Sequence, residues 1–257
     1  MKKTLTVYLQ NKKVAHSLFV PYIMAGANGL DKLESEIQML AANGADAIEV
    51  GIPFSDPVAD GPIIQAAGIK SRKLGTTFKK IIQKLQEFQS PVPLILMGYT
   101  NSFFTYGLSQ LSKDLANTQV KGVIIPDLPF EHRQLIKPTL DQADIALIQL
   151  VTLTSSEERV TELLTEAEGF VYAVTINGIT GTDANYQDKL EHHLKKICQK
   201  ADIAVLAGFG ISNAEHVQQF NQLCDGVVIG SHIVASLSQS GVEETGRMLM
   251  ELFSKIE

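Results

Sequence analysis

Cysteine is scarce in this chain of 257 residues: Cys198 and Cys224 lie in unrelated segments, without the spacing of a metal site. Because structural disulfides belong to oxidising compartments, we expect two reduced packing residues and a cytoplasmic protein. No apolar run approaches the roughly 18 residues that a membrane-spanning helix requires. The first residues, MKKTLTVYLQNKKV, lack the apolar segment and the small-residue cleavage site of a secretory signal, so we expect none.

Basic stripes are also missing. The net charge is −6, and no cluster of lysine and arginine is available to neutralise phosphates, which argues against a nucleic-acid-binding protein. Hydrophobic residues make up 45% of the chain and charged residues 19%, a balance typical of a packed globule and too apolar for a disordered chain. The sequence contains no linker or low-complexity tract. We therefore expect residues 1–257 to form a single domain.

Eight apolar, strand-like runs recur along the chain. They span residues 19–24, 47–51, 93–97, 122–125, 145–151, 170–174, 204–207 and 226–229. Helical stretches lie between them, at residues 31–44, 77–89, 131–142, 156–166, 186–200, 213–219 and 242–256. Strands that are apolar throughout are buried on both faces, and their alternation with helices implies a parallel sheet. Eight such units predict an α/β fold, a (β/α)₈ barrel, while the absence of a G-x-G-x-x-G turn after the first strand weakens a dinucleotide-binding alternative.

The second predicted strand carries an acidic residue, Glu49. Alternation places Glu49 on one face with small neighbours, and the aliphatic Ile48 and Val50 on the other. A buried carboxylate needs a partner or a function, so Glu49 is either half of a structural ion pair or a functional group. Its place near the C-terminal end of the strand favours function, because barrels hold their catalytic groups there. Asp56 and Asp60 lie in the loop that follows.

Three glycine-bearing loops follow the last three predicted strands, at residues 177–181, 208–212 and 230–231. Glycine lets a backbone N–H approach an anion closely, and a short helix beginning at Ser231 would point its positive end at the same place. Barrels commonly hold phosphate with the loops after strands seven and eight. The three loops together predict a small phosphate-bearing ligand.

Several motifs are specific enough to indicate a family. The stretch EVGIPFSDPVADGPIIQAA, together with INGITG, LAGFGIS and VVIGSHIV, resembles the alpha subunit family of tryptophan synthase. FVPYIMAG, LMGYTN and IPDLP extend the resemblance over essentially the whole chain. Membership implies retro-aldol cleavage of indole-3-glycerol phosphate to indole and D-glyceraldehyde 3-phosphate. It also implies no cofactor in this chain, and an α2β2 complex in which a beta subunit carrying pyridoxal phosphate uses the indole to make L-tryptophan.

The resemblance assigns roles to individual residues. The family's catalytic positions match Glu49 and Asp60. Its substrate-binding positions match Phe19, Ile64, Met97, Tyr172, Thr180 and Phe209, and its phosphate-binding positions match Gly181, Gly210, Gly230 and Ser231. The positions that face the beta subunit match Asp56, Pro126, Asp127 and Pro129. The chain departs from the family's usual residues at Ala27-Asn28, Ile63, Thr175-Ile176-Asn177 and His232, the last of which replaces a small residue.

The implied reaction consists of proton transfers. One carboxyl, Glu49, can protonate indole C3 and then collect the proton of the adjacent chain hydroxyl. Burial in the barrel is expected to raise its pKa so that it starts as an acid. Asp60, in a wetter loop, is expected to stay ionised and to stabilise positive charge at the indole N–H. Alternation directs Tyr172 inward, although aromatic packing explains that residue nearly as well.

Other functions remain open at this point. A phosphate-sugar isomerase would keep the glycine loops but need different acid–base partners, and a non-catalytic subunit would only activate its partner. Schiff-base chemistry needs a lysine at a strand end, and none of the eight predicted ends has one. The six histidines are scattered, and His192 and His193, successive on a helix, point apart, so no metal site is expected.

Overall fold

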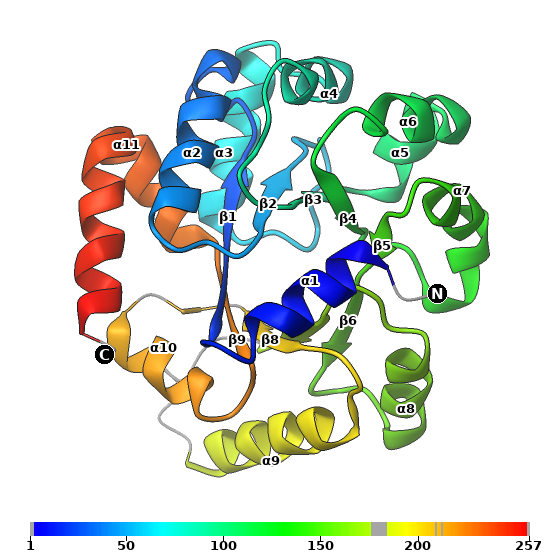
Figure 1. Ribbon diagram of the computed structural model, residues 1–257, viewed down its shortest axis with the longest axis vertical. Helices are drawn as coiled ribbons and strands as arrows, with labels where there is room; N and C mark the ends of the chain where they lie inside the picture. Colours follow the sequence, from blue (N-terminus) through cyan, green and yellow to red (C-terminus); the bar gives the residue numbers. More distant parts are fainter. Residues whose placement is uncertain (1–2, 176–183, 209, 212, 256–257) are drawn as a thin grey trace.

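The inner layer of the molecule is a barrel of parallel strands, seen in the computed structural model of the chain (Figure 1). The structure describes residues 3–175, 184–208, 210–211 and 213–255. The strands are β1 (Leu18–Met24), β2 (Ile48–Gly51), β3 (Leu94–Met97), β4 (Val120–Ile124), β5 (Ala146–Leu147), β6 (Gln149–Thr152), β7 (Val171–Val174), β8 (Val205–Gly208) and β9 (Gly226–Ile229). Almost all of their residues are buried, as parallel strands covered on both faces require.

The chain itself closes the barrel. The strand order is β5-β4-β3-β2-β1-β9-β8-β7-β6, so the two ends of the order are consecutive in sequence. The predicted fifth strand, 145–151, is divided at Ile148: its first half pairs with β4 and its second half with β7. The Ile148 amide donates to the Val123 carbonyl at 3.0 Å across this junction. The predicted (β/α)₈ fold is therefore confirmed, with nine short strands among the described residues where eight were expected.

Helices form the outer layer around the strands (Figure 1). They are α1 (Thr4–Lys12), α2 (Leu33–Ala42), α3 (Pro62–Lys73), α4 (Phe78–Gln86), α5 (Thr100–Tyr106), α6 (Leu108–Leu115), α7 (Lys137–Gln142), α8 (Glu157–Thr165), α9 (Ala184–Lys200), α10 (Ala214–Asn221) and α11 (Ser231–Ser254), with short 3₁₀ helices η1 (Leu30–Lys32) and η2 (Phe130–Leu135). The side chains of Thr77, Ser156 and Asn213 accept backbone N–H groups at the starts of α4, α8 and α10. No helix in the described ranges is both long and apolar enough to cross a membrane.

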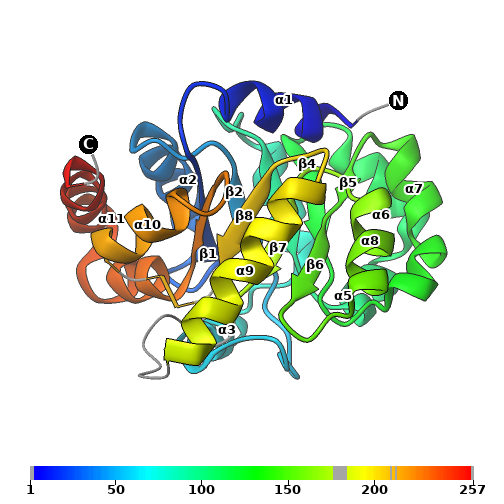
Figure 2. The same cartoon turned by 90° about the horizontal axis from the view of Figure 1, so that it is seen from below.

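One end of the barrel is plugged by α1, which lies across it opposite the connection between β2 and α3 (Figure 2). Leu5 and Leu9 of this helix are fully buried and join inward-facing strand residues such as Val20 and Ile95 in one apolar cluster. Each such leucine contributes on the order of 2 kcal/mol through burial. The plug leaves the other end, where the strands finish, for a ligand.

The sequence patterns do not predict α1, α3, α5 and α6, which are short or carry no clear apolar stripe in sequence. Two helices are predicted at the end of the chain, one beginning at Ser231 and one spanning 242–256, and the structure joins them in α11, which ends at Ser254. They meet at Gly241, whose backbone is not helical (φ 79°, ψ −173°). This conformation suits glycine, which has no Cβ to clash at positive φ.

Candidate active site

Glu49 lies inside the barrel near the C-terminal end of β2. Its side chain is 1% exposed, while Ile48 and Val50 pack outward against the helices, as alternation predicted. No described group hydrogen-bonds to Glu49 Oε1, and no described cation pairs with the carboxyl, so Glu49 is not half of a structural ion pair. Burial without a counter-charge raises its pKa from 4.5 to about 8. The group is thus a protonated acid at neutral pH.

Asp60 is held in the loop after β2 by Tyr99, from the end of β3. The Tyr99 hydroxyl accepts a hydrogen bond from the Ala59 amide at 3.0 Å and also hydrogen-bonds to the Asp60 carboxyl. The Tyr99 ring stacks on Phe54 with centroids 4.9 Å apart. Burial raises the pKa of Asp60 to about 6, and the Tyr99 hydrogen bond opposes the rise. Asp60 is thus more buried than expected for a loop residue. Its pKa still lies below that of Glu49, so Asp60 remains mostly ionised at pH 7.

Two tyrosines place their hydroxyl groups beside these carboxyls. Tyr22 is the residue of β1 that pairs in register with Glu49, and Tyr172 reaches the same space from β7. A Cβ at Gly51 would collide with the Tyr22 hydroxyl, and one at Gly208 with the Tyr172 ring, so both glycines make room for aromatic side chains. Burial, followed by the nearby carboxyl charge, raises both phenol pKa values well above 10. Both phenols therefore stay neutral.

These groups line one cavity of about 260 Å³ at the open end of the barrel. Its described lining is Tyr22, Glu49, Ala59, Asp60, Gly61, Ile63, Ile64, Met97, Tyr172, Gly210, Ile211, Val228, Gly230, Ser231, His232 and Ala235. The structure thus brings together both predicted acids, three residues predicted to bind substrate (Ile64, Met97 and Tyr172) and three predicted to bind phosphate (Gly210, Gly230 and Ser231). Thr180, Gly181 and Phe209 lie outside the described residues.

The predicted position of Phe19 in the cavity is wrong. The resemblance places it in the indole pocket, but its side chain lies on the outer side of β1, where its ring centroid is 4.6 Å from that of Phe253 in α11. Successive strand residues face opposite sides, so an inward Tyr22 puts Phe19, three positions earlier, on the outside. Tyr22 is the residue of β1 that the cavity contains.

The four residues expected to face a partner subunit lie at the same end of the molecule as the cavity, in the loops after β2 and β4. Asp56, Asp127 and Pro129 are exposed, and Pro126 is half-buried. Asp127 also has a structural role, because its Oδ1 accepts hydrogen bonds from Thr100 N at 2.8 Å and from Thr100 Oγ1 at 2.9 Å. The carboxylate therefore caps the start of α5 and links it to the loop after β4.

Sequence reasoning missed Tyr22 and Tyr99 as site residues and named His232 only as a departure from the family. No signal in the sequence marks Tyr22, which is identified by the register of the structure, where it is the neighbour of Glu49 on the adjoining strand. Tyr99 directly follows the strand-end motif LMG, where barrels place functional groups.

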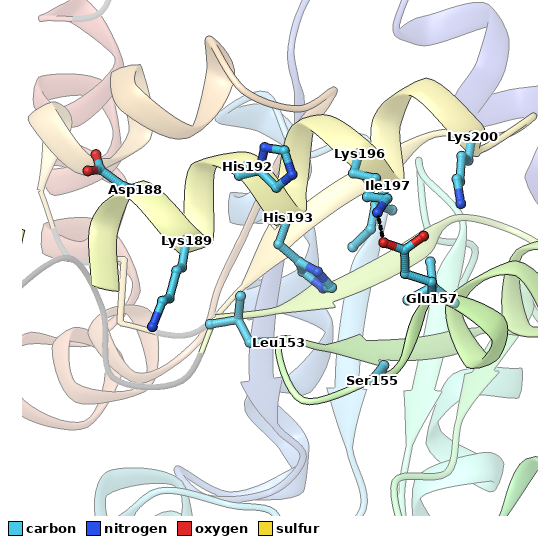
Figure 3. A pocket seen from close by; sticks show the side chains of 11 residues that line it. Leu153, Ser155, Glu157, Asp188, Lys189, His192, His193, Lys196, Ile197 and Lys200 are labelled. Carbon is cyan, nitrogen blue, oxygen red and sulfur yellow. Dashed lines mark hydrogen bonds and ion pairs between the residues drawn. The ribbon is translucent and has the colours of Figure 1, made fainter. Parts of the chain in front are cut away.

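A second hollow, of about 550 Å³, lies on the outside of the barrel between α8 and α9 (Figure 3). Lys196 of α9 meets Glu157 of α8 across it, and His192 and His193 point in different directions, as expected (Figure 3). Lys189 and Lys200 on its rim are exposed. Water-screened, paired charges of this kind leave the side chains chemically ordinary. The barrel-end cavity is therefore the better candidate for catalysis.

Comparisons with known proteins agree with this geometry. A family model described as tryptophan synthase alpha chain matches residues 8–255. The tryptophan synthase alpha chain of Streptococcus sanguinis is 51% identical over 242 residues, covering 93% of each chain, and that of Listeria welshimeri is 48% identical over 251 residues, covering 98% of this chain and 97% of the other. The solved tryptophan synthase subunit alpha of Campylobacter jejuni superposes with a TM-score of 0.86 at 30% identity, covering 95% of this chain and 98% of the other. The chain therefore belongs to the tryptophan synthase alpha chain family, the lyases that cleave indole-3-glycerol phosphate.

Proposed function

We propose that this chain cleaves indole-3-glycerol phosphate with Glu49 as the proton shuttle and Asp60 as the charge-stabilising group. The observation that carries the proposal is the buried carboxyl of Glu49, whose Oε1 has no hydrogen-bond partner among the described residues and which lines the same cavity as Asp60 and the start of α11. A buried acid without a counter-charge lowers the stability of the folded protein, so its presence in a ligand-sized cavity favours a catalytic role.

The reaction begins with the protonated form of Glu49. Its proton moves to indole C3, and the ring becomes an electron-poor indolenine whose positive charge is shared by the ring nitrogen. The Asp60 carboxylate accepts a hydrogen bond from that N–H and stabilises the charge. The Glu49 carboxylate then takes the proton of the hydroxyl next to C3, the C–C bond breaks, and indole and glyceraldehyde 3-phosphate form. Glu49 ends protonated, as it began.

The other lining residues form two groups, one suited to the indole ring of the substrate and one suited to its phosphate. Ile64, Met97 and Tyr172 supply an apolar wall suited to the indole ring. Gly210, Gly230 and Ser231 supply backbone N–H groups and a hydroxyl suited to the phosphate. By resemblance, Thr180, Gly181 and Phe209 complete these two sets.

The partner in this proposal is a beta subunit carrying pyridoxal phosphate, in an α2β2 complex that uses the released indole for L-tryptophan. The exposed Asp56, Asp127 and Pro129, together with Pro126, form the proposed contact at the mouth of the cavity. Residues 1–257 act as one catalytic domain, and the location is the cytoplasm.

The experiment is an indole-release assay on indole-3-glycerol phosphate, with and without a beta subunit. This chain contains no tryptophan, so without the partner indole fluorescence is read over a background free of protein tryptophan. We expect release that rises when the partner is added. If neither the chain nor the complex releases indole, the proposed function is wrong. A phosphate-sugar isomerase would give that result, and a merely activating subunit would keep full activity in the complex after Glu49→Gln.

A further inference from the structure

His232 is the second residue of α11 and lines the cavity at its phosphate end. The side chain is half-buried, and burial lowers the pKa of its imidazole below 6.5 with no contribution from a charged or hydrogen-bonding neighbour. The ring therefore enters the reaction cycle neutral at pH 7, with one N–H to donate. The proposed mechanism gives it no role.

The described lining of the cavity has several acidic side chains and no lysine or arginine, so His232 is its basic side chain. Five ionisable side chains line it in the described part of the chain: Tyr22, Glu49, Asp60, Tyr172 and His232. Four of these are acids that are neutral or negative, and no lysine or arginine is among the described lining residues. A phosphate group carries close to two negative charges at pH 7. Among the described lining residues, only the His232 imidazole can offer such a group a side-chain N–H.

The starts of the two neighbouring helices differ in a way that points to an anion at α11. The start of α10 is capped by the chain itself. The Asn213 side chain accepts a hydrogen bond from the His216 amide at 2.8 Å, and the acidic Glu215 lies in the first turn. Helix α11 follows Gly230, with no side-chain cap and no acidic residue in its first turn. No side chain of the cap residue covers its first N–H groups, so they can donate hydrogen bonds to a ligand, and the positive end of the helix favours an anion.

The start of α11 also lies within reach of the reacting end. A Cβ built on Gly230 would be 3.5 Å from Tyr22 Cβ and 3.6 Å from Ile64 Cδ1, so the helix begins against the apolar wall of the cavity. The same cavity contains Glu49. A single small molecule can therefore touch the shuttle with one end and α11 with the other.

We propose that the His232 imidazole binds the phosphate of the substrate by donating a hydrogen bond to it, beside the first amides of α11. The inference rests on the proposed function and goes further, because the positions assigned by resemblance offer only backbone N–H groups and a serine hydroxyl. A hydrogen bond to a charged oxygen is about twice as strong as a neutral one. His232 thus raises affinity for the charged tail and leaves the indole end to other residues.

The test uses two probes that occupy opposite ends of the cavity, glycerol 3-phosphate and indole. Their affinities are measured by calorimetry on the full chain and on its His232→Ala and His232→Gln variants. We expect His232→Ala to weaken glycerol 3-phosphate about tenfold and indole by less than about twofold. His232→Gln keeps a neutral donor and should fall between. In the complex, KM for indole-3-glycerol phosphate should rise similarly while kcat changes little.

His216→Ala is the matched control, since it removes a half-buried histidine from the first turn of α10, outside the described cavity lining. We expect it to change neither affinity. Unchanged glycerol 3-phosphate binding in His232→Ala, or an equal loss for both probes, would overturn the inference. If the alanine variant does not fold, His232→Gln decides by the same comparison. Failure of the wild type to release indole would instead overturn the proposed function, and the probe comparison would still stand.

Discussion

Two hollows of this molecule, the barrel-end cavity and the hollow between α8 and α9, hold their charged groups in opposite ways. At the barrel end, Glu49 is almost fully buried, and this burial raises its pKa to about 8. Between α8 and α9, Glu157 is exposed and paired with Lys196, and this pairing lowers its pKa (Figure 3). The same residue type is an acid at neutral pH in one hollow and an ordinary anion in the other.

The difference shows that burial, more than the size of the hollow, gives a site its chemistry. The outer hollow has the larger volume and more ionisable side chains, but water screens most of them. Glu49 is buried from solvent, so a charge on its carboxyl costs free energy unless a proton or a ligand compensates it. Changes at the barrel end should therefore alter the reaction, while changes on the outside should not.

The largest effect is expected from Glu49→Gln, which keeps the shape of the side chain and removes its transferable proton. Indole release by the complex should fall about 10³-fold, while glycerol 3-phosphate still binds, because the phosphate end is remote. Glu36→Gln is the control. Glu36 is also buried, with a pKa raised to about 7, but it accepts a hydrogen bond from Asn28 at 2.9 Å outside the described cavity lining. An equal loss of indole release in both variants would mean that the loss comes from changing any buried carboxyl, and would contradict the role of Glu49 as the proton shuttle.

Asp60→Asn should cost less, about 10²-fold in kcat, because it removes the charge that stabilises the indolenine but leaves the shuttle in place. The measurement is kcat and KM for indole release by the complex, with the loss falling mainly on kcat. A loss confined to KM would assign Asp60 to ground-state binding and contradict its role in stabilising charge.

Tyr99→Phe should act through Asp60 and shift the pH dependence of the reaction. Asp60 must be ionised, so the rate falls as pH falls through its pKa of about 6. The Tyr99 hydrogen bond lowers that pKa, and its loss should raise it and move the acid limb of the profile to higher pH. We expect about a tenfold loss at pH 6 and a smaller one at pH 8. Tyr106→Phe, which loses a 2.6 Å bond to Asp114 elsewhere, should leave the limb unmoved. A loss independent of pH would contradict this mechanism.

The smallest effect is expected from Glu157→Gln in the outer hollow. Its pairing with Lys196 is exposed, so the melting temperature should change by less than about 2 °C and indole release should not change. Calorimetry and the same indole assay check this. A large loss of activity would mean that the two hollows are coupled, and the contrast between them would fail.

Much of the barrel could be predicted because its signals are local. Apolar runs separated by helical stretches indicate parallel strands, and one acid between aliphatic neighbours fixes the face on which Glu49 lies. The strand LFVPYIM carries no such marker: all seven residues of β1 are buried, so its sequence does not say which face is inside. The pattern of β1 therefore cannot exclude Phe19 from the cavity, and only the register of Tyr22 with Glu49 does so.

The setting of Asp60 could not be predicted from its own loop. Its hydrogen bond comes from Tyr99, about 40 residues later, and the drier environment follows from that packing. The division of the fifth strand has a similar origin. One half of the segment pairs with β4 and the other with β7, which depends on closure of the whole barrel.

The protonation state of Glu49 is the most direct test of this account. Infrared difference spectra between the wild type and Glu49→Gln isolate the C=O band of the protonated carboxyl and follow it with pH. We predict that the band persists at pH 7 and disappears with a midpoint near 8. A midpoint near 4.5, the ordinary value for glutamate, would show that the buried carboxyl is ionised at neutral pH and cannot deliver the first proton.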